Sequence, residues 1–302
     1  MQPRTFQRYN ACLTQFLEWC RENKEDATSV AELDELMCDY IHDLYFAGGS
    51  LHSASNALSA LGIHLPESCG HMLSSSRALK GWRRLKPPKP WPPMTYPIAV
   101  SVAVSLSGAG FLREAIGVLL AFECYLRVGE LVGLRREDVA AGGDVRLGGE
   151  YSGVALRLRS TKTGVNQWVT VRDPEVAFLL LALVRNTAPH SLLFPTSTWR
   201  FRQVFKKACS GLGVDSVGFV PHSLRHGGAT RDFLRGMSLE SILARGRWAS
   251  TKSARHYIQS GRALLLSIHL PLSLAKHAAV LAISPAHFVL SSAPSHRSGS
   301  WH

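Results

Sequence analysis

The sequence has few cysteines, and none of them is placed as in a metal site or a dense disulfide framework. The six cysteines are Cys12, Cys20, Cys38, Cys69, Cys124 and Cys209. No two of them have the short sequence spacing that is typical of zinc ligands. We therefore expect buried free thiols in a reducing compartment.

Long apolar runs are scarce as well. The most apolar stretch, residues 264–283, is interrupted by Pro271, Lys276 and two histidines. Its longest run without Lys or Arg is too short for a comfortable membrane span. The polar start, MQPRTFQRYN, predicts no signal peptide. We expect no membrane association and interpret the apolar stretch as a docking helix.

Acidic residues are fewer than basic residues, and the excess of positive charge is concentrated in particular segments of the chain. The 302 residues include 34 Lys and Arg against 22 Asp and Glu, a formal charge of +12. Residues 1–76 have a net charge of −6, residues 77–92 of +6 and residues 93–262 of +10. Such a balance favours an acidic partner, most often nucleic acid. With 46% hydrophobic residues the chain is expected to fold into one large or two ordinary domains.

Apolar periodicity predicts a mainly α-helical fold with a small antiparallel β-sheet. Four helical patterns occupy residues 1–85, and KPPKPWPP then excludes helix. Residues 154–159 (VALRLR) and 165–171 (VNQWVTV) alternate with period two around STKTG, which predicts a β-hairpin. We predict a helical domain at 1–85, a basic linker at 86–96, a main domain at 97–262 and a tail at 263–302, in which disordered chain follows the docking helix.

A helix start in PHSLRHGGATRDFLRG carries a His and an Arg. Pro221 and Ser223 mark the start, so His222 and Arg225 point the same way from the first turn, where free N–H groups favour a phosphate. Taken alone, this short pattern is more often an ordinary capped helix. His222 and His226 have the spacing of a zinc pair, but the Glu of the metalloprotease motif is missing, so we predict no metal.

Other residues suited to phosphate chemistry accompany this helix in a fixed order. Arg127, in CYLRVGELVGLRREDV, stands 98 residues before Arg225. Lys162 occupies the expected hairpin turn. Trp248 follows Arg225 by 23 residues, and Tyr257 follows Trp248 by nine. Each residue alone is more often structural, whereas the ordered set points to a common site.

The set resembles the tyrosine recombinase family, also called the phage integrase family. LRVGELVGLRREDV is similar to its first-arginine box, PHSLRHGGAT to its second box and GRWASTKSARHYI to its closing box. The resemblance covers residues 113–260, and residues 1–92 more weakly resemble the family's helical, SAM-like core-binding domain. It implies a tyrosine-recombinase catalytic domain that cleaves and rejoins DNA at specific sites without metal, ATP or other cofactor.

The resemblance also implies the roles of individual residues. Arg127 and Arg225 would bind the phosphate through paired, permanently charged donors, with Glu130 holding Arg127 in place. Lys162 would protonate the leaving 5′ oxygen, His222 would act as base or hydrogen-bond donor, and Trp248 would donate its indole N–H. Tyr257 would be the nucleophile that forms a 3′-phosphotyrosyl link. The expected catalytic set is therefore Arg127, Lys162, His222, Arg225, Trp248 and Tyr257, supported by Glu130.

The expected partner is double-stranded DNA, bound as a homotetramer on two sites. Arg83, Arg84, Lys86 and Lys89 are predicted to contact it, and the protein is expected on DNA in a nucleus or a bacterial cytoplasm, which the sequence does not distinguish. Tyr125 is a weaker candidate nucleophile because on a helix it would point away from Arg127. The alternative function is a non-catalytic DNA-binding protein derived from a mobile-element integrase, with residues 223–235 and 238–245 as a helix-turn-helix.

Overall fold

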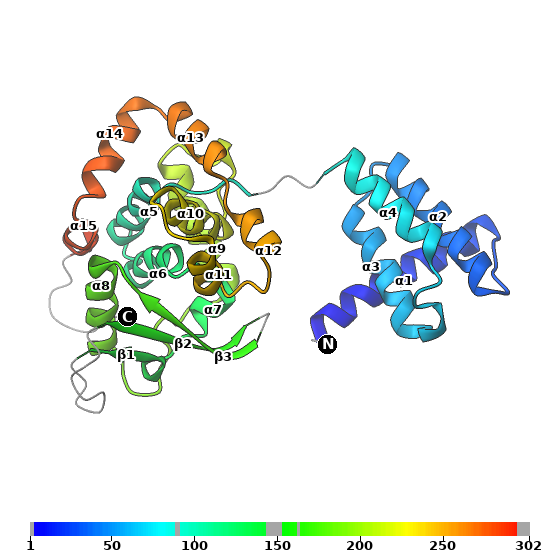
Figure 1. Ribbon diagram of the computed structural model, residues 1–302, viewed down its shortest axis with the longest axis horizontal. Coiled ribbons are helices and arrows are strands. Elements are labelled where there is room, and N and C mark those ends of the chain that lie inside the picture. Colours follow the sequence, from blue (N-terminus) through cyan, green and yellow to red (C-terminus); the bar gives the residue numbers. More distant parts are fainter. Residues whose placement is uncertain (1–2, 88–90, 143–152, 162–163, 295–302) are drawn as a thin grey trace. The chain divides into compact units, whose positions relative to one another are not determined.

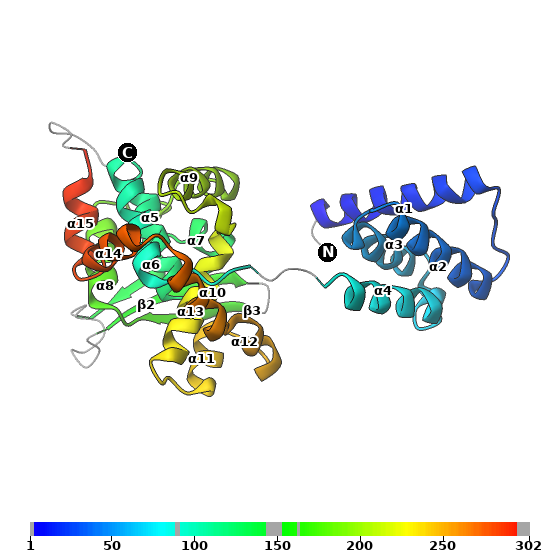
Figure 2. The same ribbon diagram turned by 90° about the horizontal axis from the view of Figure 1, so that it is seen from above.

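The computed structural model describes residues 3–87, 91–142, 153–161 and 164–294. The chain divides into two compact units, residues 1–90 and residues 91–302 (Figure 1). Figure 2 shows both units from a second direction.

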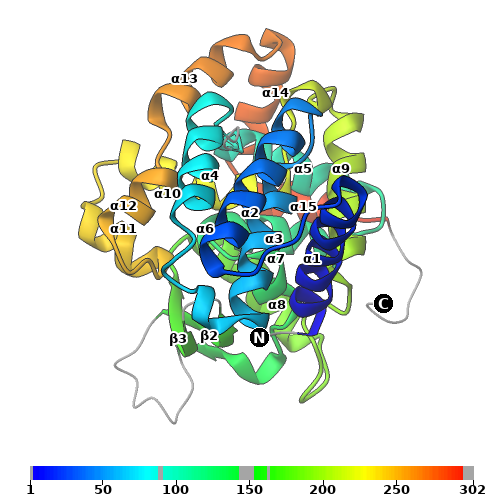
Figure 3. The same cartoon turned by 90° about the vertical axis from the view of Figure 1, so that its right-hand side faces the viewer.

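In its described part, residues 3–87, the first unit is a bundle of four helices (Figure 3). They are α1 (Pro3–Asn23), α2 (Val30–Phe46), α3 (Leu51–His64) and α4 (Leu73–Leu85), with a short 3₁₀ turn at Pro66–Ser68. Ser29 and Ser50 cap α2 and α3 by accepting a backbone N–H. Asp34 of α2 accepts the N–H groups of Ser74 and Ser75 at 2.7 and 2.9 Å, which fixes the start of α4 against α2. Phe16 is among the aromatic and aliphatic side chains of the bundle's core.

The second unit is mainly helical and includes a small sheet. Its helices are α5 (Tyr96–Gly108), α6 (Leu112–Glu123), α7 (Val128–Val132), α8 (Pro174–Arg185), α9 (Thr198–Gly211), α10 (Pro221–Leu234), α11 (Leu239–Gly246), α12 (Thr251–Tyr257), α13 (Ser260–His269), α14 (Leu272–Leu281) and α15 (Pro285–Ser292). Short 3₁₀ turns lie at Arg136–Asp138 and Asp215–Val217. The core is built largely from α5, α6, α8 and α9, whose buried side chains form one cluster.

Within the described residues, the sheet has three antiparallel strands in the order β1 (Val139–Ala141), β2 (Val154–Thr161) and β3 (Gly164–Val171). Pairs from Val154↔Val171 to Thr161↔Gly164 form the predicted hairpin. Leu156, Leu158 and Val169 are buried on one face. The predicted fold class, mainly α with a small antiparallel sheet, is confirmed.

The helix that carries His222 and Arg225 lies at the centre of the second unit. In α10, two glycines allow this close packing: a Cβ on Gly227 would lie 1.9 Å from the carbonyl oxygen of Met94, and one on Gly228 would lie 2.1 Å from that of Phe122. Met94 is fully buried and donates its N–H to the carbonyl of Ser223 at 3.0 Å. The end of the predicted linker is therefore packed against α10 and belongs to the second unit.

The structure corrects the expectation for the tail. After α13, the helices α14 and α15 continue to Ser292, and both contact α5, with Ala278, Leu281 and Val289 buried in the core. The predicted disorder after the docking helix is therefore wrong for Pro285–Ser292, which form α15. No single helix in the described ranges is long and apolar enough to cross a membrane; the combined segments Thr251–His269 and Leu272–Leu281 pass that test together but bend by 113°.

Candidate active site

The start of α10 places His222 and Arg225 as the sequence predicts. Pro221 is the first helical residue, and the Ser223 hydroxyl accepts the N–H of Val220 at 3.2 Å. Pro and Ser fit these positions because Pro lacks the N–H that a first turn leaves unpaired, and the hydroxyl satisfies another donor. His222 and Arg225 are thus fixed on one side of a rigid first turn.

Arg225 is completely buried, and its guanidinium is held by main-chain carbonyls. Its Nη1 donates to the carbonyl of Tyr125 and its Nη2 to that of Gly246 at 2.7 Å. Its Nε is buried without a hydrogen-bond partner in the described part of the chain. Burial, together with the positive charges of Arg127 and Arg247, lowers the pKa of Arg225, but an arginine remains protonated near neutral pH.

A second arginine, Arg127, lies at the start of α7 and is bound by Glu130. The Arg127 Nη1 donates to one oxygen of the Glu130 carboxylate at 2.6 Å, and the Arg127 backbone N–H donates to the other at 2.9 Å. The predicted Arg127–Glu130 pair is therefore present as a hydrogen-bonded ion pair. Because Glu130 is buried, it holds the Arg127 side chain in a defined direction.

The sequence interpretation missed a third guanidinium, that of Arg247. Its Nη2 donates to Glu130 at 3.0 Å and to the carbonyl of Tyr125 at 3.3 Å. Arg247 thus shares Glu130 with Arg127 and the Tyr125 carbonyl with Arg225. It adopts a left-handed conformation, φ 55°, at the end of α11, which turns the chain into the site. Only the presence of an Arg beside Trp248 in the sequence could have suggested it.

Tyr257 and Trp248 stack over Arg225. Their ring centroids are 4.6 Å apart with an angle of 24° between the planes. The Arg225 Cζ lies 4.8 Å from the Trp248 ring and 5.2 Å from the Tyr257 ring. The Trp248 indole Nε1 is buried and has no hydrogen-bond partner in residues that the structure describes. Tyr257 ends α12, whose N-terminal cap is Ser250.

Two histidines of α10 border the Tyr257 ring. His222 lies 5.5 Å and His226 4.6 Å from it between ring centroids. Burial, with the charges of Arg225 and Arg127, lowers the pKa of His222 to about 4. Burial and the neighbouring His222 and His256 lower the pKa of His226 to about 3. Both imidazoles are therefore neutral at pH 7, and a neutral imidazole can accept a proton.

Tyr125 lies in a place that the sequence interpretation did not foresee. It follows α6 with a left-handed φ of 49°, so it does not point as a helical residue would. Its ring stacks 5.9 Å from that of Trp248, and its hydroxyl donates to Asp232 at 2.5 Å. The side chain is completely buried, which leaves its phenol inaccessible as a nucleophile. Tyr125 instead packs against Trp248, and its carbonyl oxygen accepts hydrogen bonds from Arg225 and Arg247.

The structure thus brings together five of the six predicted catalytic residues and the supporting Glu130. They are Arg127, His222, Arg225, Trp248 and Tyr257. Lys162 and Lys89 lie outside the described residues. Arg83, Arg84 and Lys86 are exposed in the first unit at and beyond the end of α4, where Lys86 lies over the Tyr45 ring at 4.5 Å.

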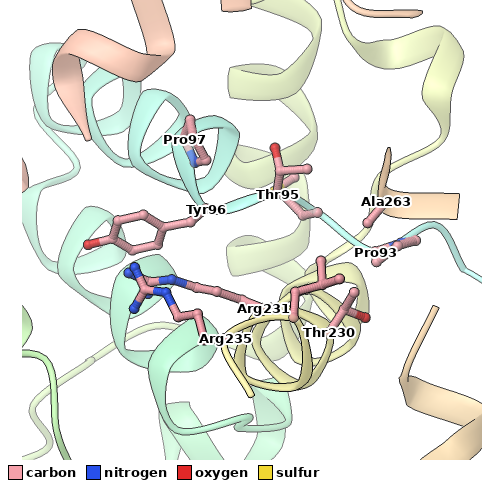
Figure 4. A pocket seen from close by; sticks show the side chains of 11 residues that line it. Pro93, Thr95, Tyr96, Pro97, Thr230, Arg231, Arg235 and Ala263 are labelled. Carbon is pink, nitrogen blue, oxygen red and sulfur yellow. The ribbon is translucent and has the colours of Figure 1, made fainter. Parts of the chain in front are cut away.

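A separate pocket of about 350 Å³ lies beside α10, between the start of α5 and the start of α13. Arg231 stacks over the Tyr96 ring at 3.6 Å in this pocket, and Thr230 and Ala263 line its other side (Figure 4). It contains none of the predicted catalytic side chains. Its relevance to the site is that Thr230, which lines it, also contacts the backbone of Tyr257.

The comparisons with known proteins agree with this geometry. The model of the phage integrase family matches residues 105–263, more than half of the chain. The chain therefore belongs to the phage integrase family, the family of tyrosine recombinases, as the sequence motifs predict. No curated protein matches the sequence.

Solved structures with the same fold are integrases and recombinases. A lambda integrase dimer bound to a COC′ core site is similar with a TM-score of 0.58 and 15% identity, over 86% of this chain and 90% of that chain. The Tn1549 transposon integrase in complex with circular intermediate DNA has a TM-score of 0.57 at 13% identity, over 84% and 98%. The XerH recombinase bound to palindromic difH substrate has a TM-score of 0.55 at 13% identity, over 92% and 79%.

Proposed function

We propose that this protein cleaves and rejoins DNA strands at specific sites, with Tyr257 as the nucleophile. The observation that carries the proposal is the position of the Tyr257 ring over the Arg225 guanidinium, 5.2 Å away, with Trp248 and His222 beside it. A phenol next to a buried guanidinium, a neutral imidazole and an indole N–H has the groups that phosphoryl transfer needs.

In the proposed reaction the Tyr257 oxygen attacks the phosphorus and the bond to the 5′ oxygen breaks. The products are a 3′-phosphotyrosyl link and a 5′-hydroxyl end. His222, whose ring centroid is 5.5 Å from that of Tyr257, takes the phenolic proton. Lys162 gives a proton to the leaving oxygen. Attack by another 5′-hydroxyl reverses these steps, so the link conserves the bond energy and the reaction needs neither ATP nor metal.

Positive charge in the cluster supports phosphate binding. Three guanidinium groups, those of Arg127, Arg225 and Arg247, face one carboxylate, that of Glu130. The described residues of the cluster therefore have a net charge of two positive charges. Burial strengthens the electrostatic attraction of this charge for a phosphate. The Arg225 Nε and Trp248 Nε1 donors are buried and have no partner among the described residues, so they can bind the oxygens of a phosphate once the Tyr257 ring turns aside.

The same geometry implies a movement when DNA binds. Arg225 is completely buried beneath the rings of Trp248 and Tyr257. A phosphate reaches its guanidinium only after the Tyr257 ring turns aside. The stacked arrangement is therefore the resting state in this proposal.

The proposed partner is double-stranded DNA, with the protein acting as a homotetramer on two sites. The lambda integrase and XerH structures of the same fold are complexes with DNA sites, which supports DNA as the partner. In this proposal residues 1–85 form the core-binding domain, and Arg83, Arg84, Lys86 and Lys89 contact DNA phosphates. The exposed position of the first three fits this role.

The helix-turn-helix alternative is less well supported. In that interpretation α11 would enter the major groove and would need exposed basic or polar side chains. Within α11, all of whose residues are described, the exposed side chains are Glu240 and Ala244. Arg245 is buried and paired with Glu123. A non-catalytic member of the family remains the second candidate, and a trapping experiment separates the two.

The test is incubation with nicked duplexes that carry the DNA borders of the protein's own gene. Release of the short strand beyond the nick makes cleavage irreversible and traps the covalent link. We expect a protein–DNA adduct that survives denaturation and disappears with protease. DNA binding without any adduct would favour the non-catalytic alternative.

A further inference from the structure

The backbone on both sides of Tyr257 is bonded to one side chain of α10. The Thr230 hydroxyl donates to the carbonyl oxygen of Tyr257 at 3.2 Å and accepts the N–H of Gln259 at 3.0 Å. Thr230 is 1% exposed, so water does not compete for these bonds. A single hydroxyl therefore satisfies two backbone groups that the end of α12 leaves unpaired.

A second side chain of α10 holds the same segment. The Gln259 Nε2 and the His226 Nδ1 are 3.0 Å apart. Burial lowers the pKa of His226 to about 3, so its ring is neutral at pH 7 and its Nδ1 can accept this bond. Gln259 is thus attached to α10 by its backbone through Thr230 and by its side chain through His226.

These bonds matter because α12 has little buried surface of its own. The helix has seven residues, and only Ala254 is buried. The remaining residues before Tyr257 are exposed: Thr251, Lys252, Ser253, Arg255 and His256. A helix of this length gains little stability by itself. The position of the Tyr257 backbone therefore depends strongly on its hydrogen bonds to α10.

We propose that Thr230 is a positioning residue for the nucleophile: it fixes the backbone at 257–259 while the Tyr257 side chain turns from its stack on Trp248 toward the phosphate. This inference rests on the proposed function. The Tyr257 oxygen must reach the phosphorus in line with the leaving oxygen, and a displacement of about 1 Å from such a geometry costs about 100-fold in rate. Without the hydroxyl, the Tyr257 carbonyl and the Gln259 N–H lose their partner.

The test compares Thr230→Val, which keeps the shape and removes the hydroxyl, with Thr230→Ser, which keeps the hydroxyl. In single-turnover cleavage of a nicked duplex, we expect adduct formation to slow about 10- to 100-fold in Thr230→Val and to stay within about threefold of the wild type in Thr230→Ser. The DNA dissociation constant should change less than about twofold in both. Equal cleavage rates in Thr230→Val and the wild type would overturn the inference.

A matched control removes another buried threonine hydroxyl. Thr187 is 5% exposed, donates to the Leu183 carbonyl at 2.7 Å and lies 3.3 Å from Arg113, and none of these residues belongs to the catalytic cluster. Thr187→Val is expected to lower the unfolding temperature while leaving the cleavage rate unchanged. A loss of cleavage in Thr187→Val as large as in Thr230→Val would show a general structural effect and would also contradict the inference.

Hydrogen–deuterium exchange gives a readout that does not require cleavage. Peptides that contain the Gln259 amide should exchange at least about tenfold faster in Thr230→Val than in the wild type and in Thr230→Ser. Unchanged exchange would refute the role of Thr230 whatever the enzyme's activity. Absence of adduct in the wild type, by contrast, would refute the proposed function, and the exchange result would still decide whether Thr230 holds this segment.

Discussion

The guanidinium of Arg247 and the carboxylate of Glu130 form a buried ion pair, with 3.0 Å between Nη2 and Oε2 and both side chains 4% exposed. Glu130 also binds Arg127, at 2.6 Å. One carboxylate therefore fixes two arginines of the cluster. Because the pair is almost free of water, removing the carboxylate leaves buried positive charge without compensation.

The first prediction concerns this carboxylate. Glu130→Gln should destabilise the second unit by about 3 kcal/mol, which lowers its unfolding temperature by roughly 6–12 °C. The exposed Glu240 of α11 offers a control, and Glu240→Gln should melt like the wild type. Thermal unfolding followed by circular dichroism measures both. A Glu130→Gln protein that melts within about 2 °C of the wild type would contradict the role of this ion pair.

Sequence patterns predicted the local features of the site, because each depends on residues close together in the chain. Pro221 and Ser223 start α10, and period-two alternation predicted the β2–β3 hairpin. The spacing of the boxes then placed Arg127 and Tyr257 in one cluster, although 130 residues separate them. That step came from the family resemblance and not from periodicity.

The features that the sequence did not reveal depend on contacts between distant segments. Tyr125 and Arg247 adopt left-handed conformations with φ of 49° and 55°, which non-glycine residues adopt only where the surrounding structure stabilises them. The Arg247 guanidinium then donates a hydrogen bond to the Tyr125 carbonyl, although 122 residues of sequence separate the two. The burial of α14 and α15 against α5 is likewise a tertiary contact, which local composition does not predict.

The second prediction follows from the two neutral histidines. The folded-state pKa values of His222 and His226, about 4 and about 3, lie below the ordinary value of 6.5. Below pH 6.5 the unfolded chain therefore binds protons that the folded protein does not, so these residues make stability fall as the pH decreases from 6.5 toward 3. Each contributes at most about 1.4 kcal/mol per pH unit.

Thermal unfolding of the wild type and of His226→Gln between pH 7 and pH 4 measures this effect. Glutamine does not titrate, so the unfolding temperature of His226→Gln should depend less steeply on pH below 6.5. Parallel curves for the two proteins would show that His226 does not have a lowered pKa.

The third prediction concerns Arg225. Arg225→Ala should slow strand cleavage by about 100- to 1000-fold, the usual effect of removing a preorganised donor to a transition state. Arg225→Lys should recover little, because a lysine lacks the planar fork that binds two acceptors. Arg235→Ala, at the exposed end of the same helix, is the control and should cleave normally. Wild-type cleavage by Arg225→Ala would remove Arg225 from the phosphate site.

The fourth prediction concerns the basic end of α4. Exchanging Arg83 and Arg84 for Ala should weaken DNA binding and flatten the plot of log affinity against log salt by about 0.9 for each DNA phosphate that is no longer neutralised. Exposed Arg21 and Lys24 at the end of α1 provide a control with the same change in charge. Their replacement by Ala should leave the slope unchanged. Equal slopes for the two double variants would place Arg83 and Arg84 away from DNA.

The central claim is that Tyr257 forms the covalent link to DNA, and mapping of the adduct tests it most directly. The wild type and Tyr257→Phe are incubated with the nicked duplex, the trapped complex is digested with trypsin, and the modified peptide is sequenced by mass spectrometry. We expect the nucleotide on Tyr257, in the peptide that spans residues 256–262, and no adduct in Tyr257→Phe despite unchanged folding and DNA affinity. An adduct on any other residue, or one that persists in Tyr257→Phe, would contradict the assignment.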